Sequence, residues 1–172
     1  GRQCDVRSDR PTRRLIDAGA PICLATDTMH GDMIEVMRWT LAVGRLQAGF
    51  VADDWQPRDV FAMGTANGAR ALGWADRIGR LAVGMLADLA VLDYRQLHLT
   101  PCIDPLGSLI HNATAADVES VFVNGEQVID QGRATRVDET EIRAEAERVC
   151  QALWQRCPNP LRPYPSAAGN AR

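Results

Sequence analysis

Residues 21–33 read PICLATDTMHGDM, and this stretch decides how the rest of the chain is interpreted. It begins as an apolar run over 21–25 and changes abruptly at Thr26-Asp27. A short apolar run that ends in polar residues indicates a buried strand. In α/β barrels, catalytic groups lie at the C-terminal ends of parallel strands. The stretch therefore predicts a strand over 21–26 that presents the Asp27 carboxylate.

Two residues of this stretch are candidates for a functional site. Asp27 is the first, because a carboxylate at a strand end can bind a divalent metal or accept a proton from water. His30 follows on the same loop and could contact a substrate or assist proton transfer. A turn aspartate and a surface histidine are the structural alternatives, and position alone leaves both open. Asp32 is better explained as a helix N-cap, with Glu35 three residues on as in a capping box.

The hydrophobic pattern predicts the order α, β, α, α, a group of strands, and α. We expect helices over 11–19, 33–47, 56–73 and 138–157, a helical turn over 106–111, strands over 21–26, 87–94, 118–123 and 126–130, and loops over 50–55 and 95–107. Asn124-Gly125 between the last two strands is the strongest short signal for a hairpin. A change of composition near 74–80 predicts a boundary between an α/β part and a small β part.

The composition is that of a globular protein without a strong charge bias. Hydrophobic residues make up 46% of the chain and charged residues 24%, with a net charge of −3. This balance argues against nucleic acid or an anionic membrane as the main partner. No apolar run approaches the ~20 residues of a membrane span, and no signal peptide is visible. The five cysteines include no CxxC pair, so we expect a reducing, cytoplasmic location rather than a disulfide framework.

Six segments occur in an order that is specific in combination. They read LIDAGAPICLATD (15–27), MIEVMRWTLAVGRLQ (33–47), MGTANGARALGW (63–74), RIGRLAVGMLADLAVLD (77–93), HLTPCIDPLGSLIH (98–111) and VESVFVNGEQVIDQG (118–132). Together they resemble the amidohydrolase superfamily, in its chlorohydrolase and aminohydrolase branch, which includes triazine hydrolases, guanine deaminase and adenosine-type deaminases. The resemblance covers about residues 11 to 150, most of the chain.

The resemblance implies an α/β fold, the C-terminal part of a metal-dependent (β/α)8 TIM barrel followed by strands of a small β-sandwich and a C-terminal helix. Residues 1–74 would belong to the barrel, 75–137 to the sandwich and 138–165 to the helix and its proline-rich end, with a disordered tail over 166–172. Asp27 matches the family's metal-binding aspartate, which also accepts the proton of the attacking water. His30 lies where substrate contacts occur.

The same resemblance implies the chemistry of the parent protein. It would hydrolyse non-peptide carbon–nitrogen bonds, or remove a halide, on a small heterocyclic substrate. It would use one Zn²⁺ or Fe²⁺ ion, and it would be a homodimer. The family's histidine ligands have no counterpart here, since no HxH or HExxH spacing occurs and the chain opens at Gly1 without Met. We therefore expect a fragment that is inactive alone.

Two other interpretations remain open. The chain could be a non-catalytic scaffold that docks onto another protein, or part of a cyclic-amide hydrolase with the same fold. Met33, Met37, Leu41 and Gly44 share one helical face, which indicates core packing rather than a cofactor box. Without the rest of a barrel, we expect this face and the strand over 21–26 to be unpaired.

Overall fold

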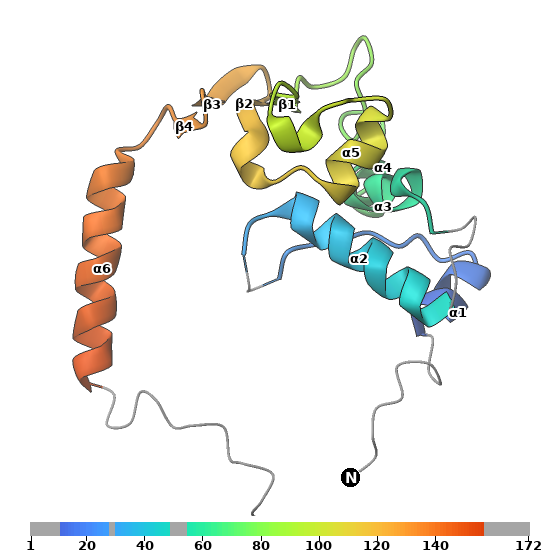
Figure 1. The fold of residues 1–172 in the computed structure, drawn as a ribbon, viewed down its shortest axis with the longest axis horizontal. Coiled ribbons are helices and arrows are strands. Elements are labelled where there is room, and N and C mark those ends of the chain that lie inside the picture. The colour runs from blue at the N-terminus through green and yellow to red at the C-terminus, as the bar shows by residue number, and fades with distance from the viewer. Residues whose placement is uncertain (1–10, 28–29, 49–54, 157–172) are drawn as a thin grey trace, which may run out of the picture. The chain divides into compact units, whose positions relative to one another are not determined.

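The computed structural model describes residues 11–27, 30–48 and 55–156. The chain divides into two compact units, residues 1–135 and 136–172. The elements of the first unit are α1 (Pro11–Asp17), α2 (Met33–Ala48), α3 (Pro57–Gly64), α4 (Ala66–Ala71), β1 (Leu89–Leu92), η1 (Leu97–Leu99), α5 (Pro105–His111), η2 (Ala115–Asp117), β2 (Val118–Val123), β3 (Glu126–Asp130) and β4 (Arg133–Ala134) (Figure 1). The second unit contains α6 (Glu139–Arg156).

Helix α2 is the centre of the first unit. It packs against α3 and α5, and its inward face contributes Ile34, Met37 and Leu41 to the core. The rest of the buried core is Trp55, Val60, Met63, Leu99, Ile110 and Ala113. The predicted core role of the Met-rich face is thus confirmed. The expectation that this face is unpaired is wrong, because α3 and α5 cover it within the chain.

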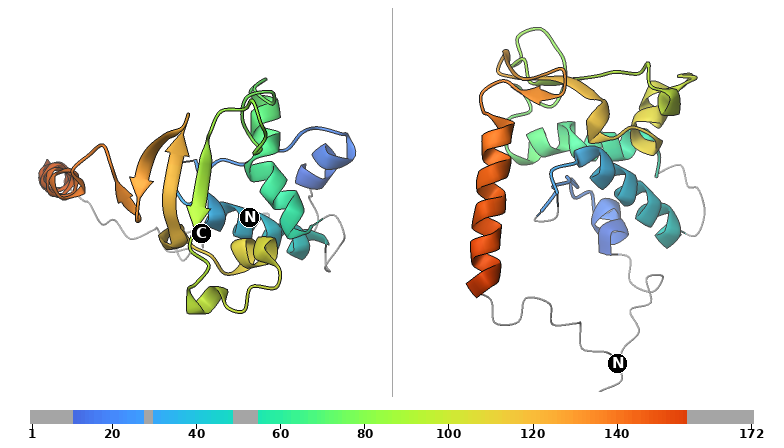
Figure 2. Two further views of the ribbon diagram at one scale, coloured as in Figure 1. Left: turned by 90° about the horizontal axis from the view of Figure 1, so that it is seen from above. Right: turned by 60° about the vertical axis from the view of Figure 1, so that its left-hand side comes forward.

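The sheet is four-stranded and antiparallel, in the order β1-β2-β3-β4. The predicted hairpin is confirmed: Asn124 and Gly125 join β2 to β3 with φ values of 50° and 81°, a left-handed conformation that this residue pair tolerates. Leu92 and Val118, from β1 and the start of β2, pack against the helical core. Figure 2 shows β1 on the side of the sheet nearer these helices.

Two loop and strand predictions are corrected. Residues 21–26 run extended but form no strand with the described residues, because a strand needs a neighbouring ladder and this segment meets helices instead. The loop predicted over 95–107 contains η1, and α5 begins at Pro105, which suits the first turn of a helix. Most of the predicted 50–55 loop and the whole 166–172 tail lie outside the described residues.

Helix α6 begins after Asp138, whose carboxylate accepts hydrogen bonds from the backbone N–H groups of Thr140 and Glu141 and so caps the helix. No side chain of α6 is buried. None of the helices in the described part of the chain is long and apolar enough to span a bilayer. Among the described cysteines, Cys23, Cys102 and Cys150 are free thiols.

Candidate functional site

The segment 21–27 lies against the helices that follow it in the sequence. The N–H of Leu24 donates to the carbonyl of Met63 at 3.0 Å, and the Asn67 side chain donates to the carbonyl of Ile22 at 2.8 Å. Side chains along the segment alternate between half-buried and exposed positions, with Ile22 and Leu24 turned inward against the core. This alternation is the period of a β-strand, although the described residues supply no ladder beside it.

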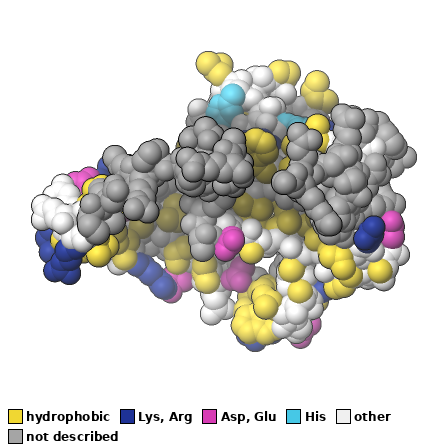
Figure 3. Space-filling model, turned by 90° about the horizontal axis from the view of Figure 1, so that it is seen from below, with side chains coloured by type: hydrophobic (Ala, Val, Ile, Leu, Met, Phe, Trp, Pro, Cys, Tyr) yellow, Lys and Arg dark blue, Asp and Glu magenta, His cyan; other side chains and the backbone are white. Residues whose placement is uncertain are grey.

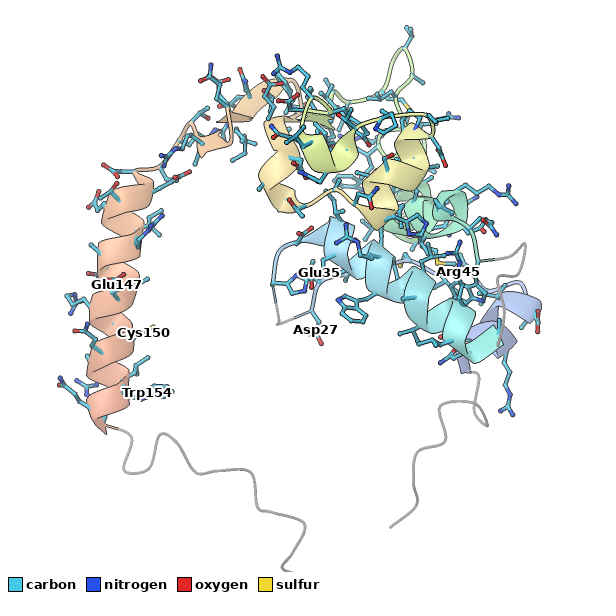
Figure 4. The ribbon with its side chains drawn as sticks, in the orientation of Figure 1. Asp27, Glu35, Arg45, Glu147, Cys150 and Trp154 are labelled. Atoms are coloured by element: carbon cyan, nitrogen blue, oxygen red, sulfur yellow. The ribbon has the colours of Figure 1, made fainter. Side chains whose placement is uncertain are left out.

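Asp27 ends this segment in an unusual backbone conformation. Its φ is 53°, in the left-handed region that few residues except Gly, Asn and Asp adopt. The side chain is exposed, and it has no hydrogen bond or ion pair with any other described residue. Figure 4 shows the carboxylate pointing away from the helices of the first unit. Among the described residues, none occupies either carboxylate oxygen.

His30 is held by two contacts at the start of α2. The backbone N–H of Asp32 donates to His30 Nδ1 at 3.2 Å, and His30 Nε2 lies 3.5 Å from Glu35 Oε2. Since Nδ1 accepts a hydrogen bond, the proton of the neutral ring lies on Nε2 and faces the carboxylate. A substrate contact by His30 stays a prediction, and it would have to replace one of these two contacts.

Asp32 caps α2, but the predicted capping box forms only in part. Its Oδ1 accepts the N–H groups of Ile34 at 2.9 Å and Glu35 at 3.1 Å, which confirms the N-cap. A capping box would pair the Glu35 side chain with the N–H of Asp32. That N–H instead donates to His30, and Glu35 accepts a hydrogen bond from Trp39 Nε1 at 3.2 Å. Through these contacts, Glu35 lies between His30 and Trp39 and connects the two side chains along the first turns of α2.

A second polar cluster was not predicted from the sequence. His98 Nε2 lies 3.0 Å from Oδ2 of Asp117, a side chain that is only 5% exposed. The same oxygen accepts the backbone N–H of Thr114 at 2.7 Å and its hydroxyl at 3.1 Å. Burial alone would raise the pKa of Asp117, but the hydrogen bonds from His98 and Thr114 outweigh it and hold this pKa below its usual value.

The only sequence signal for this cluster is local. Thr114 and Asp117 have the three-residue spacing of a capping box, which forms around η2. His98 lies 19 residues before Asp117, so no spacing rule connects the two. The cluster joins η1 to the start of β2 and is fully accounted for by structural contacts.

The described residues do not form a metal site by themselves. Within 11–27, 30–48 and 55–156, no three or more His, Cys, Asp or Glu side chains are grouped closely enough to hold an ion. Zinc sites in proteins normally have about four ligands. Asp27 is exposed and has no partner among the described residues, so its carboxylate is chemically able to serve as one ligand of a larger set.

Comparison with known proteins places most of the chain in one family. A sequence model described as "Amidohydrolase family" matches residues 6–128. A 5'-deoxyadenosine deaminase from Methanosarcina barkeri is 33% identical over 150 residues, which cover 85% of this chain and 34% of that protein. The chain therefore spans about a third of the length of this relative.

Solved structures give the same result for the fold. An adenosine deaminase from Xanthomonas campestris with bound zinc superposes with a TM-score of 0.79 and 26% identity, over 84% of this chain and 34% of the other. An atrazine chlorohydrolase from Arthrobacter aurescens TC1, complexed with zinc, superposes with a TM-score of 0.70 over 81% of this chain and 32% of the other. At 23% identity, the second likeness supports the fold alone.

Proposed function

This chain belongs to the amidohydrolase family, and we propose that it is the C-terminal part of a metal-dependent aminohydrolase that acts on a heterocyclic substrate. The observation that carries the proposal is the placement of Asp27. Within the region matched to the family, it ends an extended segment, its backbone is left-handed, and its carboxylate has no partner among the described residues. Strained residues of this kind concentrate at functional sites.

The proposed architecture follows the family resemblance. Residues 1–74 would supply the last part of a (β/α)8 barrel, with 21–26 as its final strand, and 75–137 would supply strands of a β-sandwich. The alternating exposure of 21–27 supports the strand assignment, and the antiparallel sheet β1-β2-β3-β4 supports the second part. Helix α6 would be the helix that follows the sandwich strands.

The proposed cofactor is a single zinc ion, with iron as the alternative. Zinc is present in the two solved relatives described above. In such a site the ion lowers the pKa of a bound water toward ~7 and stabilises developing negative charge. Asp27 would contribute one carboxylate oxygen and accept a proton. The remaining ligands would belong to the part of the parent protein that corresponds to the two thirds of the relative outside the match.

The proposed reaction is hydrolytic removal of an amine from a purine-type ring, in a substrate about the size of a nucleoside. Support comes from the 5'-deoxyadenosine deaminase relative and the zinc-bound adenosine deaminase structure. Removal of a halide from a triazine is the alternative within the same branch. A cytoplasmic homodimer is part of the same proposal.

A fusion protein tests this function. We would replace the aligned third of the Methanosarcina barkeri deaminase with the matched segment of this chain and measure ammonia release from 5'-deoxyadenosine, together with zinc content. We expect a zinc-containing deaminase, and we expect Asp27→Asn to reduce kcat by 10²-fold or more. Asp76→Asn is the matched control, since Asp76 is also exposed and has no hydrogen bond or ion pair with another described residue.

The outcome that contradicts the proposal is equally clear. If the fusion folds and Asp27→Asn and Asp76→Asn have the same small effect on ammonia release, Asp27 has no role in the reaction. Metal analysis of the isolated chain is a second check. Stoichiometric zinc or iron on the chain alone would show that it holds a complete metal site, contrary to the assignment of Asp27 as one ligand of a larger set.

A further inference from the structure

Glu35, on the first turn of α2, contacts two side chains at once. Its Oε1 accepts a hydrogen bond from Trp39 Nε1 at 3.2 Å, and its Oε2 lies 3.5 Å from His30 Nε2. In Figure 4, Glu35 lies on the turn of α2 that directly follows the loop from Asp27. The proposed metal site and proton transfer make no use of this carboxylate. Glu35 therefore joins the helix to a loop residue of the candidate site.

The donor and acceptor roles along these contacts are fixed on both sides of the His30 ring. The indole N–H of Trp39 can only donate, and the ionised carboxylate of Glu35 can only accept. At the other ring nitrogen, the backbone N–H of Asp32 donates to Nδ1 at 3.2 Å. The imidazole is the one group here that can change its role, and both neighbours require the tautomer with the proton on Nε2. The contacts thus set the tautomer of the ring as well as its direction.

A purely structural role explains the contact between Glu35 and His30 poorly. Their side chains are 42% and 36% exposed, and exposed pairs of this kind add little to stability. Figure 3 shows histidine side chains at the molecular surface. A glutamate in the first turn favours the start of a helix through its charge alone, and it needs no partner to do so. What the geometry adds is a fixed direction for a ring that solvent can reach.

The covalent chain keeps His30 close to Asp27. The two residues are three positions apart, so their Cα atoms are separated by at most about 11 Å. An accessible imidazole at this distance contributes to a reaction only when its ring is held in the productive orientation. In catalytic sites, a carboxylate behind a histidine commonly fixes both the tautomer and the orientation.

We propose that Glu35 is a positioning residue for the reaction. It keeps the proton of the His30 ring on Nε2, so that Nδ1 accepts a hydrogen bond from a donor group of the substrate, a hydroxyl or an amine. The substrate replaces the N–H of Asp32 at Nδ1, because that exposed N–H can bind water instead. Trp39 meanwhile holds Glu35 in place. The inference rests on the proposed function, since the group that His30 contacts belongs to the substrate of that reaction.

The first test uses the isolated chain and needs no activity. In isotope-labelled protein, NMR reports the ring tautomer of His30 and the hydrogen exchange of the Trp39 indole. Glu35→Gln offers one acceptor oxygen in place of two. We expect it to shift the ring signals of His30 and to speed indole exchange by about threefold or more. The control is Glu119→Gln, which removes the same charge from an exposed position of β2 and should change neither signal.

The second test uses the fusion protein described above. We expect Glu35→Gln to lower kcat/KM for 5'-deoxyadenosine by about 5- to 10-fold, chiefly by raising KM, with zinc content unchanged. His30→Ala should lower kcat/KM at least as much. If Glu35 acts through His30, the double variant should be no worse than His30→Ala alone. Glu119→Gln should match the unsubstituted fusion.

Three results would overturn the positioning role. One is a His30 ring whose signals Glu35→Gln leaves unchanged. Another is a pair of kinetic losses that add in the double variant, because Glu35 would then act independently of His30. The third is an equal kinetic loss in Glu119→Gln, which would make the effect one of charge alone. A lower thermal midpoint in Glu35→Gln without any kinetic change would reduce Glu35 to a residue that stabilises the start of α2.

The two tests separate this inference from the proposed function. A fusion that deaminates its substrate, depends on Asp27 and is indifferent to Glu35→Gln supports the function and contradicts the positioning role. A folded, zinc-containing fusion that releases no ammonia contradicts the function and, with it, the substrate contact of His30. The ring signals of the isolated chain then decide by themselves whether Glu35 fixes His30.

Discussion

His98 Nε2 lies 3.0 Å from Asp117 Oδ2, and this contact fixes η1 to the turn that precedes β2. Asp117 is 5% exposed, so its carboxylate depends on protein partners in place of water. Two of these partners are the N–H and the hydroxyl of Thr114. The pair therefore couples a loop to the sheet through one buried charge.

The first prediction concerns acid. The pKa of Asp117 is lower in the folded chain than its ordinary value of 3.8. A lowered pKa contributes stability that is fully present above the unfolded value and is lost as pH falls through the folded value. We expect the free energy of unfolding to fall below about pH 4. Urea unfolding of the wild type and of Asp117→Asn at pH 7 and pH 3 measures this loss.

At pH 7, Asp117→Asn should cost about 1–3 kcal/mol, because it removes a charged hydrogen-bond acceptor from a buried position. The variant should then lose less stability than the wild type on acidification. Hydrogen bonds from Arg95 lower the pKa of Asp93 to about 2, so Asp93 stays mostly ionised at pH 3 and protonates only in stronger acid. Both proteins are compared at each pH so that any contribution from other carboxylates cancels. His98→Ala removes the other partner of this contact and should also lower the free energy of unfolding. The exposed His111 provides the control, and an equal loss of stability in His111→Ala would contradict a specific role for His98.

The second prediction concerns the packing of α2 against Trp55, which lies two residues before the start of α3. A Cβ added at Gly44 would overlap the ring of Trp55, which is almost fully buried. We expect Gly44→Ala to destabilise the chain by about 1–3 kcal/mol, although alanine favours helices. Gly68→Ala in α4 is the matched control, because nothing lies within 4 Å of its added Cβ. That control should be neutral or stabilise by up to about 1 kcal/mol, and the same loss in both variants would refute the overlap.

The local parts of this fold were predictable from sequence. Asn124-Gly125 specifies its hairpin through the φ angles of two adjacent residues, and Asp32 specifies the start of α2 through its own side chain. The spacing of Met37 and Leu41 identified the buried side of that helix. Each of these signals acts within a few residues, so no knowledge of the rest of the chain is needed.

The parts that depend on distant partners were not predictable. Residues 21–26 have the apolar pattern of a strand, but a strand forms only when a neighbour supplies its ladder. Here Met63 and Asn67 supply single hydrogen bonds instead. The pairing of His98 with Asp117 joins two loops and leaves no periodic trace. For the candidate site, the sequence pointed to Asp27 as a candidate residue, but only the structure shows that its backbone is left-handed.

The third prediction separates the backbone role of Asp27 from its chemical role. With φ at 53° and no described partner for its side chain, Asp27 can be replaced by Asn without loss of stability, within about 0.5 kcal/mol. Asp27→Val should cost about 1–2 kcal/mol, because a β-branched residue is strained at positive φ. Thermal or urea unfolding of both variants checks this. A destabilising Asp27→Asn would reveal a structural contact of the carboxylate and would weaken its assignment as a ligand.

The last prediction concerns Asp32, whose two carboxylate oxygens make one local and one long-range contact. Its Oδ1 caps α2, and its Oδ2 accepts the N–H of Ala115 at 3.2 Å, 83 residues away in η2. Asp32→Ala removes both, and we expect a loss of about 1–2 kcal/mol in the free energy of unfolding.

Asp32→Ser distinguishes the two parts of this loss. A serine hydroxyl can cap the helix but offers one oxygen in place of two, so it should restore the cap and not the contact with η2. Hydrogen exchange would then show α2 protected as in the wild type while the Ala115 amide exchanges faster. If Asp32→Ser and Asp32→Ala expose α2 equally, the capping role is contradicted. If the Ala115 amide is unaffected in both variants, the long-range hydrogen bond does not contribute to the stability of the unit.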